Sequence, residues 1–212
     1  MKKITTILMS LILTVAVGQA NAKEAAKKAA PAKETAQVTK WASDASHSSI
    51  KFTVAHLMVS EVEGRFKTFS GNIETSSPDF NNAKISYISD VNSITTEDET
   101  RDKHLKSDDF FNAEKYPNMT FVSTSFKKVK NNIYSLEGNL TIRDVTKSVK
   151  FAVLYGGTVV DPWGNTKAGF KATAKISRKA YNLKWNKITE AGGAVVGDDV
   201  NIILNLEFGK QK

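Results

Sequence analysis

Apolar and polar residues alternate with a period of two along most of the chain from Trp41 onward. In segment 49–56, SIKFTVAH, every second residue is apolar until a histidine ends the row. Successive side chains of a β-strand point to opposite faces, so such a row predicts a strand with one apolar face. The same alternation recurs in segments 69–74, 85–91, 119–123, 134–142, 149–155, 170–176 and 200–208.

Turn signals separate these predicted strands. Pro, Gly and Asn/Asp clusters occur at 77–79, 130–132, 156–157, 161–165 and 192–193, and no long amphipathic helical period intervenes. Roughly eight antiparallel strands with short links indicate a sandwich or a barrel. We predict an all-β fold, an eight-stranded antiparallel up-and-down barrel, because closure removes exposed strand edges. Such a barrel is just wide enough to hold one slender ligand.

The stretch 101–121, RDKHLKSDDFFNAEKYPNMTF, departs from this pattern. It is too apolar for a solvated loop and too charged for a core helix. We expect a short helical segment near 99–115 over or beside the barrel mouth, with Leu105, Phe110 and Phe111 pointing inward. The alternative is a surface helix whose aromatic side chains plug the core.

Small residues share the inward faces with large ones. They are Gly71, Ser89, Ser123, Gly138, Ala172 and Ala174. A solid core would need volume at these positions, because empty space lowers stability. The pattern favours a ligand cavity, although small and large residues could instead interdigitate.

The N-terminal residues predict export. Lys2 and Lys3 precede a short apolar run, and Ala20-Asn21-Ala22 is a small-x-small cleavage pattern. We assign 1–22 to a signal peptide, 23–40 to a flexible Ala/Lys-rich spacer and 41–212 to the barrel domain, and expect a periplasmic protein. The chain has no Cys, so disulfides and thiol chemistry are excluded.

Charge argues against a nucleic-acid partner. The net charge of the chain is +8, but residues 41–212 hold 23 basic and 20 acidic residues, or +3. A nucleic-acid-binding domain would need a basic stripe with aromatic residues of its own. The spacer lysines could attract anionic lipid headgroups transiently.

Several separated motifs resemble the YceI-like family of bacterial polyisoprenoid-binding proteins. They are HSSIKFTVAHLMVSEVEGRFKTFSGNIE (47–74), ITTEDETRDKHLKSDDFFNAEKYPNMTFVST (94–124), GNLTIRDVTKSVKF (138–151), Gly169-Phe170-x-Ala172 with Ile176-x-Arg178, and VGDDVNIILNLE (196–207). The resemblance implies a lipocalin-like barrel whose tunnel holds a polyprenyl phosphate or a prenylated quinone. It also implies no catalysis, no cofactor besides that ligand, and a homodimer for some members.

Candidate ligand-binding residues follow from the strand faces and this resemblance. A long apolar tail would need apolar lining, and Arg is suited to a phosphate because it offers a planar fork of donors. His56 ends an inward row, and Asn186 could donate to a quinone carbonyl. The apolar candidates are Phe52, Val54, Phe66, Phe69, Leu105, Phe110, Phe111, Phe121, Leu140, Ile142, Phe151, Phe170, Ile176 and Trp185; the head-group candidates are His56, Arg101, His104, Arg178 and Asn186.

Two alternatives belong to other classes of protein. A metal- or redox-associated protein could use His47, His56 and His104, but no short-range His pair is present. A lipid-modifying enzyme could use His56 or His104 as a base, with a nearby aspartate such as Asp98, Asp102 or Asp108 as its orienting partner. The sequence contains no nucleophile motif such as G-x-S-x-G, so we predict no catalytic residue and no metal site.

Overall fold

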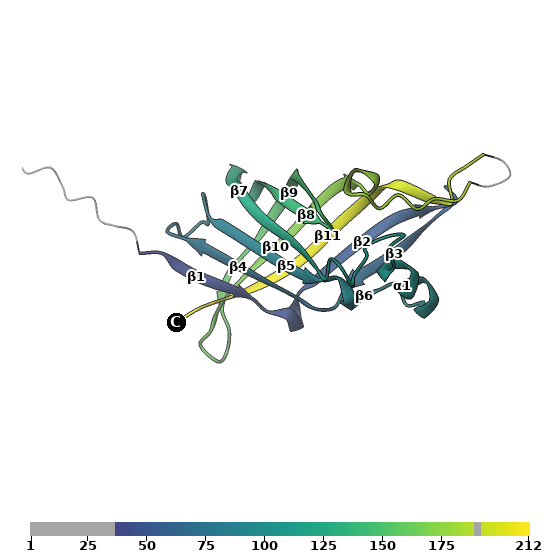
Figure 1. Ribbon diagram of the computed structural model, residues 1–212. Coiled ribbons are helices and arrows are strands. Elements are labelled where there is room, and N and C mark those ends of the chain that lie inside the picture. The colour runs from purple at the N-terminus through teal and green to yellow at the C-terminus, as the bar shows by residue number, and fades with distance from the viewer. Residues whose placement is uncertain (1–36, 189–191) are drawn as a thin grey trace, which may run out of the picture. The chain divides into compact units, whose positions relative to one another are not determined.

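The computed structural model describes residues 37–188 and 192–212, and its main feature is one antiparallel β-sheet closed on itself (Figure 1). The alternating segments form its strands. Four short helical elements interrupt them: η1 (Ala45–His47), η2 (Val91–Ser93), α1 (Glu99–Lys106) and η3 (Lys179–Tyr181). The strands are β1 (Thr39–Ser43), β2 (Ser49–His56), β3 (Ser60–Phe66), β4 (Phe69–Thr75), β5 (Lys84–Asp90), β6 (Ile94–Thr95), β7 (Asn118–Lys130), β8 (Ile133–Ile142), β9 (Val145–Val160), β10 (Thr166–Ser177) and β11 (Val196–Lys210).

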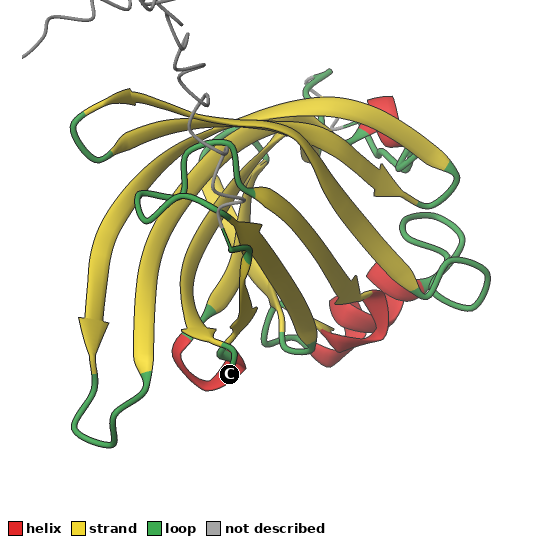
Figure 2. Cartoon of the chain, turned by 90° about the vertical axis from the view of Figure 1, so that its left-hand side faces the viewer, coloured by secondary structure: helices red, strands yellow, loops and turns green. Residues whose placement is uncertain are grey.

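Three pairs of these strands act as single bent strands. Both β1 and β2 pair with β11, in registers that include Trp41↔Lys210 and Ile50↔Leu204. In the same way β4 pairs with β1 while β3 pairs with β2, and β5 pairs with β4 while β6 pairs with β3. The eleven strands therefore form eight bent or straight strands, each antiparallel to its sequence neighbours (Figure 2). The predicted eight-stranded up-and-down barrel is confirmed.

The chain leaves the sheet between β6 and β7, where α1 lies. Asp98 caps the helix by accepting a hydrogen bond from the Arg101 amide at 2.9 Å. Lys103, His104 and Lys106 lie in the last turn, where positive charge favours a helix C-terminus. The predicted helical segment near 99–115 is thus confirmed for 99–106, and turns follow it. No helix in the described ranges is long and apolar enough to span a membrane.

Aromatic rings close one end of the barrel interior. Phe80, from the β4–β5 connection, is 1% exposed. Its ring centroid lies 5.1 Å from that of Trp41, 5.2 Å from Phe170 and 5.5 Å from Tyr155. Tilted and edge-on contacts at these distances are favourable aromatic geometries, so this end is packed with the protein's own side chains.

The barrel begins slightly before the predicted boundary at Trp41. Thr39 and Lys40 already pair with Thr75 and Glu74 of β4, so they belong to the sheet rather than to the spacer. The predicted signal peptide, 1–22, and the predicted spacer as far as residue 36 lie outside the described residues.

Candidate functional site

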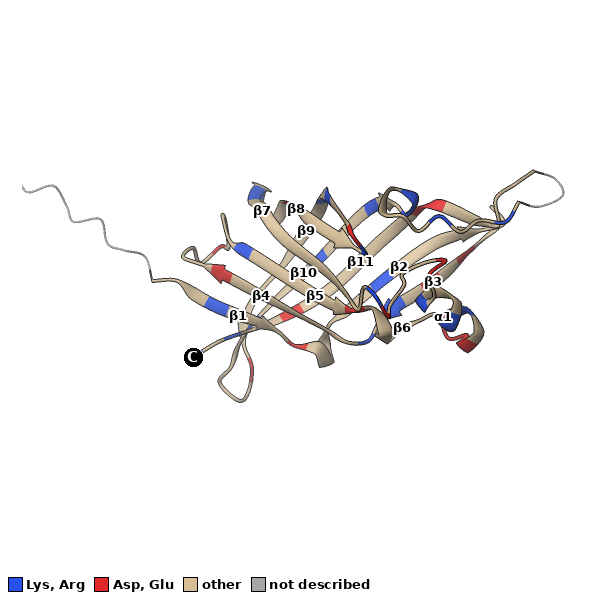
Figure 3. Cartoon of the chain, in the orientation of Figure 1, with Lys and Arg blue, Asp and Glu red and all other residues tan. Residues whose placement is uncertain are grey.

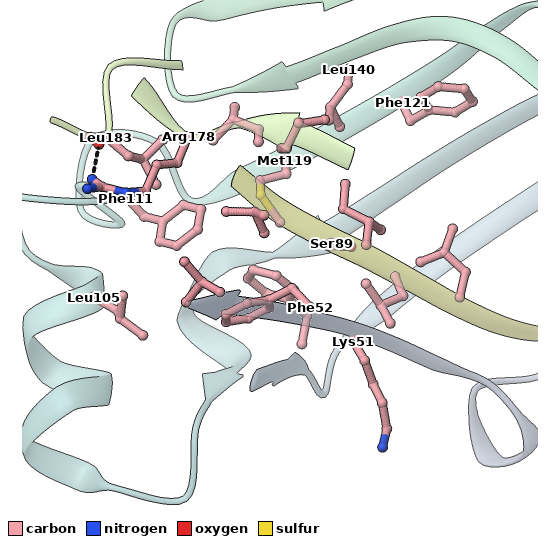
Figure 4. A pocket seen from close by; sticks show the side chains of 18 of the residues that line it. Lys51, Phe52, Ser89, Leu105, Phe111, Met119, Phe121, Leu140, Arg178 and Leu183 are labelled. Carbon is pink, nitrogen blue, oxygen red and sulfur yellow. Dashed lines mark hydrogen bonds between the residues drawn. The ribbon is translucent and has the colours of Figure 1, made fainter. Parts of the chain in front are cut away.

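The other part of the barrel interior is a cavity of about 500 Å³. This volume falls in the range of small-molecule sites, ~300–1,000 Å³. Its wall is formed by inward-facing side chains of the strands, with α1 and the segment after it on one side (Figure 4). The predicted apolar residues found in this wall are Phe52, Val54, Phe66, Leu105, Phe110, Phe111, Phe121, Leu140, Ile142, Phe151, Phe170, Ile176 and Trp185.

Phe69 is the predicted tunnel residue that does not line the cavity. It is the first residue of β4, directly after the bend at 67–68, and its ring stacks on that of Tyr87 at 5.9 Å. Tyr87 is in the wall instead. Further lining residues were not named as candidates, although the same alternation places them on inward faces: Ile50, Ile73, Ile85, Met119, Leu136, Val153, Val200, Ile202, Leu204, Leu206 and Phe208.

The small inward residues account for the hollow only in part. Ser89 and Ala172 line the cavity. In contrast, a Cβ added to Gly71 would collide with the Tyr87 ring, and one added to Gly138 would collide with the Phe121 ring. The expectation that these two glycines mark vacant volume is wrong, because a neighbouring aromatic ring already covers each of them.

The cavity opens beside α1. Asp98, Thr100 and Arg101 all line it, and all three are exposed. Leu105, one turn further along the helix, points toward the cavity in Figure 4. Polar residues of α1 and of its N-terminal cap thus lie at the mouth, while the far end is the aromatic cluster around Phe80.

Arg101 is partly committed to the protein itself. Its Nε donates to the Thr96 hydroxyl at 2.7 Å and its Nη2 donates to the Thr96 carbonyl at 2.9 Å. Asp102 also bonds to Thr96, accepting from its amide at 2.7 Å and from its hydroxyl at 2.6 Å. These bonds tie α1 to the end of β6. Nη1 of Arg101, 4.0 Å from the Asp98 carboxylate, stays at the mouth.

His104 lies in the cavity wall among aromatic rings. Its Nε2 is 2.8 Å from the Asp109 carboxylate, and its ring is edge-on to Phe110 and Trp185, each at 5.1 Å between centroids. The aspartate bonded to His104 is thus Asp109 and not Asp98, Asp102 or Asp108, the partners named for a histidine base. A His–Asp pair alone supplies a base without a nucleophile.

The other predicted head-group residues take different positions. His56 ends β2 and lines the cavity, as its place in the inward row predicts. Asn186 is exposed and is absent from the described cavity wall. The amide–quinone contact proposed for Asn186 is therefore not supported by its position.

Arg178 lines the cavity but is occupied by backbone carbonyls. It is 4% exposed. Nε donates to Gly197 at 2.7 Å, Nη1 to Leu183 at 2.6 Å and to Trp185 at 2.8 Å, and Nη2 to Val196 at 3.2 Å. Four of the five N–H donors of a guanidinium thus connect the segment after η3 to the start of β11. Burial lowers the pKa of Arg178, and Asp198 opposes this by raising it.

Arg143, which was not among the predicted site residues, positions the aromatic segment at the mouth. Its Nη1 donates to the Phe110 carbonyl at 2.8 Å and the Asn182 carbonyl at 3.3 Å, and its Nη2 donates to the Asp108 carboxylate at 3.1 Å. Arg143 lies in the β8–β9 turn with a left-handed φ of 55°. The feature of the sequence that could have marked Arg143 is its position in a two-residue turn.

One His/Asp/Glu group among the described residues has the spacing of a metal site: Asp44, His47 and Glu207. The Lys167 ammonium lies 2.8 Å from the Asp44 carboxylate and 3.1 Å from that of Glu207. A lysine therefore already supplies the positive charge that these carboxylates need. His56 and His104 are not members of this group.

Charge is dispersed over the barrel. Basic and acidic residues are interspersed along the strands and on α1 (Figure 3). This distribution differs from the continuous basic stripe expected of a nucleic-acid-binding surface.

Comparisons with known proteins agree with this fold. Residues 41–208 match the YceI-like domain. A UPF0312 protein of Staphylococcus aureus strain USA300 is 36% identical over 172 residues, which cover 81% of this chain and 98% of that protein. Crystal structures of Burkholderia cenocepacia BcnA (25% identity, TM-score 0.68, covering 78% of this chain and 98% of that one) and of the Campylobacter jejuni YceI protein (32%, 0.64, 74% and 90%) are similar. A polyisoprenoid-binding domain from Saccharophagus degradans shares the fold at 16% identity (TM-score 0.58, 81% and 98%).

Proposed function

The chain belongs to the YceI-like family, and from this premise we propose that it is a non-catalytic protein that holds a long isoprenoid lipid in its barrel. The ligand class is a polyprenyl phosphate or a quinone with a prenyl tail. The observation that carries the proposal is the apolar cavity of about 500 Å³ that is closed by aromatic rings at one end and open beside α1 at the other. The similar fold of a domain described as polyisoprenoid-binding supports it.

The energetics favour such a ligand. Each isoprene unit carries five carbons, so its burial contributes roughly 3 to 4 kcal/mol at about 0.8 kcal/mol per methylene. A few units exceed the free-energy cost of immobilising a ligand, on the order of 4 to 15 kcal/mol. Apolar contacts alone could therefore hold the tail.

The open end sets the orientation that we propose. The tail would lie toward Phe170 and Phe208, and the polar head would remain near Arg101, His56 and His104, which are polar residues of the wall. Arg178 would act mainly through its positive charge, because four of its N–H donors are already bonded to carbonyls. Export to the periplasm, where such a lipid would be stored, sensed or carried, is part of the proposal.

Extraction of the purified protein with organic solvent, followed by mass spectrometry, tests the function. We expect an isoprenoid at a stoichiometry approaching one per chain. A well-folded preparation that contains no apolar ligand and does not take up a prenylated quinone would contradict the proposal.

A further inference from the structure

The hairpin between β2 and β3 ends in three consecutive exposed apolar residues. Leu57, Met58 and Val59 are 41%, 71% and 85% exposed. The turn is tight, because the Val59 amide donates to the His56 carbonyl at 3.2 Å. Tight hairpin turns usually carry polar or glycine residues such as Asn-Gly. Packing within the barrel therefore does not account for this apolar sequence.

The backbone of the turn also disfavours these residues. Leu57 and Met58 have left-handed φ angles of 51° and 60°. Both central positions of a type I′ turn require such angles, and Asn and Gly adopt them more easily than Leu or Met. Two strained positions thus hold large apolar side chains that are left in solvent. An outlier of this kind is a reason to look for a function.

A second loop continues the apolar surface. The Leu57 amide donates to the Val195 carbonyl at 2.9 Å, and the Val195 amide donates to the Lys187 carbonyl at 2.9 Å. Ile188, the next residue, pairs with Ala194 and is 72% exposed. We call Leu57, Met58, Val59 and Ile188 the apolar tip.

Basic residues accompany the apolar tip. Lys184 and Lys187 are exposed on the same loop as Ile188. Neither forms an ion pair with any residue in the described parts of the chain. Exposed apolar side chains and exposed lysines on neighbouring loops match the two layers of an anionic membrane surface, the acyl boundary and the headgroups.

The apolar tip adjoins the cavity. His56 and Val195, each next to or bonded to Leu57, both line the cavity wall. In Figure 1 the β2–β3 hairpin lies in the same half of the barrel as α1, beside which the cavity opens. The exposed apolar residues are thus next to residues of the cavity wall, at the half of the barrel that carries α1.

We propose that the apolar tip docks the barrel onto an anionic lipid bilayer with the cavity mouth facing the membrane. The inference rests on the proposed function, since an isoprenoid tail would pass between bilayer and cavity without crossing water. Leu57, Met58 and Val59 insert at the acyl boundary, and each of the two lysines strengthens binding to anionic headgroups by about fivefold.

The decisive variant is Leu57→Asn with Met58→Gly. Asn-Gly suits the left-handed angles of the turn, so the variant removes the apolar side chains without weakening the fold. The matched control is Trp163→Ser. Trp163 is 83% exposed in the β9–β10 hairpin, at the end of the barrel where β11 pairs with β1 rather than with β2.

Flotation with phosphatidylglycerol–phosphatidylethanolamine vesicles gives the readout, with the protein purified after expression of the full chain. We expect the Asn-Gly variant to lower vesicle partitioning by about tenfold or more, and Trp163→Ser to leave it unchanged. Equal flotation of the Asn-Gly variant and the wild type overturns the proposal, as does an effect of the variant on self-association alone. Isoprenoid content is measured in parallel: its absence, with flotation still dependent on the tip, overturns the proposed function but supports the docking surface.

Discussion

The Arg178 guanidinium donates a 2.6 Å hydrogen bond to the carbonyl oxygen of Leu183, and this contact connects β10 to the irregular segment that borders the cavity mouth. Three further bonds from the same side chain reach Trp185, Val196 and Gly197. Arg178 therefore organises the wall from within. A head-group role would be secondary to this structural one.

Arg178→Lys should lower the free energy of unfolding by about 2 to 4 kcal/mol. The ammonium keeps the charge but cannot reach four carbonyls in two segments, and each buried acceptor left without a donor costs ~1 to 3 kcal/mol. Urea unfolding measures the change. Lys175→Met, which removes an exposed ion pair with Asp199, is the control and should change stability by less than about 1 kcal/mol. Equal effects of the two substitutions would contradict the structural role of Arg178.

Gly138→Ala should lower stability, whereas Gly169→Ala should not. A Cβ at Gly138 would collide with the Phe121 ring and the Val122 carbonyl oxygen, whereas a Cβ at Gly169 would meet nothing within 4 Å. We expect Gly138→Ala to cost about 1 to 3 kcal/mol through overpacking, and Gly169→Ala to be neutral or stabilising by up to about 1 kcal/mol. Thermal unfolding of both variants distinguishes a covered glycine from an open one, and the same loss in both would mean that Phe121 does not cover Gly138.

Relative to the stability that each substitution costs, Phe111→Ala should weaken isoprenoid binding more than Phe110→Ala does. Both rings line the cavity, but Phe110 is buried against His104 and Trp185, while Phe111 is half-buried and meets Phe66 edge-on. We expect Phe110→Ala to cost about 3 to 5 kcal/mol and Phe111→Ala less. Quinone titration at a temperature where both variants are folded is the measurement. Binding losses that merely follow stability would show that both rings serve the core.

The Asp44–Lys167 ion pair should contribute stability over a defined pH window. The hydrogen bond from Lys167 is the largest cause that lowers the pKa of Asp44, and hydrogen bonds from Ser46 and His47 lower it further. In turn, Asp44 and Glu207 raise the pKa of Lys167. The contribution of Asp44 is complete above its unfolded pKa of about 3.9 and is lost as the pH falls through the lower folded value. That of Lys167 is complete below about 10.4 and is lost as the pH rises through the higher folded value.

Lys167→Met tests this window. The variant should be less stable than the wild type by about 1 kcal/mol, with a constant difference between pH 5 and 9. The difference should shrink in strong acid and above about pH 10.5. Urea unfolding across pH measures it, and a difference that varies between pH 5 and 9 would assign the coupling to other groups.

The alternation of apolar residues was sufficient to predict the barrel. Period-two rows are a local property of the sequence, and row 49–56 predicted correctly that Phe52, Val54 and His56 would share the inward face. The bends at η1 and at 67–68 were not predicted. They separate β1 from β2 and β3 from β4, and Phe69, directly after the second bend, stacks on Tyr87 and does not line the cavity.

The roles of the polar residues were harder to predict, because hydrogen-bond partners distant in sequence decide them. The guanidinium of Arg178 suits a phosphate, but its donors are bonded to the carbonyls of Trp185, Val196 and Gly197. Those carbonyls lie in segments whose path is set by packing and not by a local pattern. Arg143 was not predicted as a site residue, yet its bonds to Asp108 and Phe110 connect the β8–β9 turn to the segment at the mouth.

Ala172→Phe separates a binding cavity from a packing defect. Ala172 faces the cavity on β10, and Ala152, its matched control, is an exposed residue on the neighbouring strand β9. A phenyl ring placed in vacant space gains apolar contact without overpacking. We therefore expect Ala172→Phe to keep or raise the melting temperature.

The same ring would occupy volume that the isoprenoid tail needs. We expect Ala172→Phe to reduce co-purified isoprenoid at least about tenfold, since displacing one isoprene unit forfeits roughly 3 to 4 kcal/mol, and Ala152→Phe to leave it unchanged. Mass spectrometry of extracts from the two variants measures the difference. If the Ala172→Phe protein is stable and retains as much lipid as the wild type, the ligand binds outside the barrel and the apolar wall of the cavity does not hold the tail.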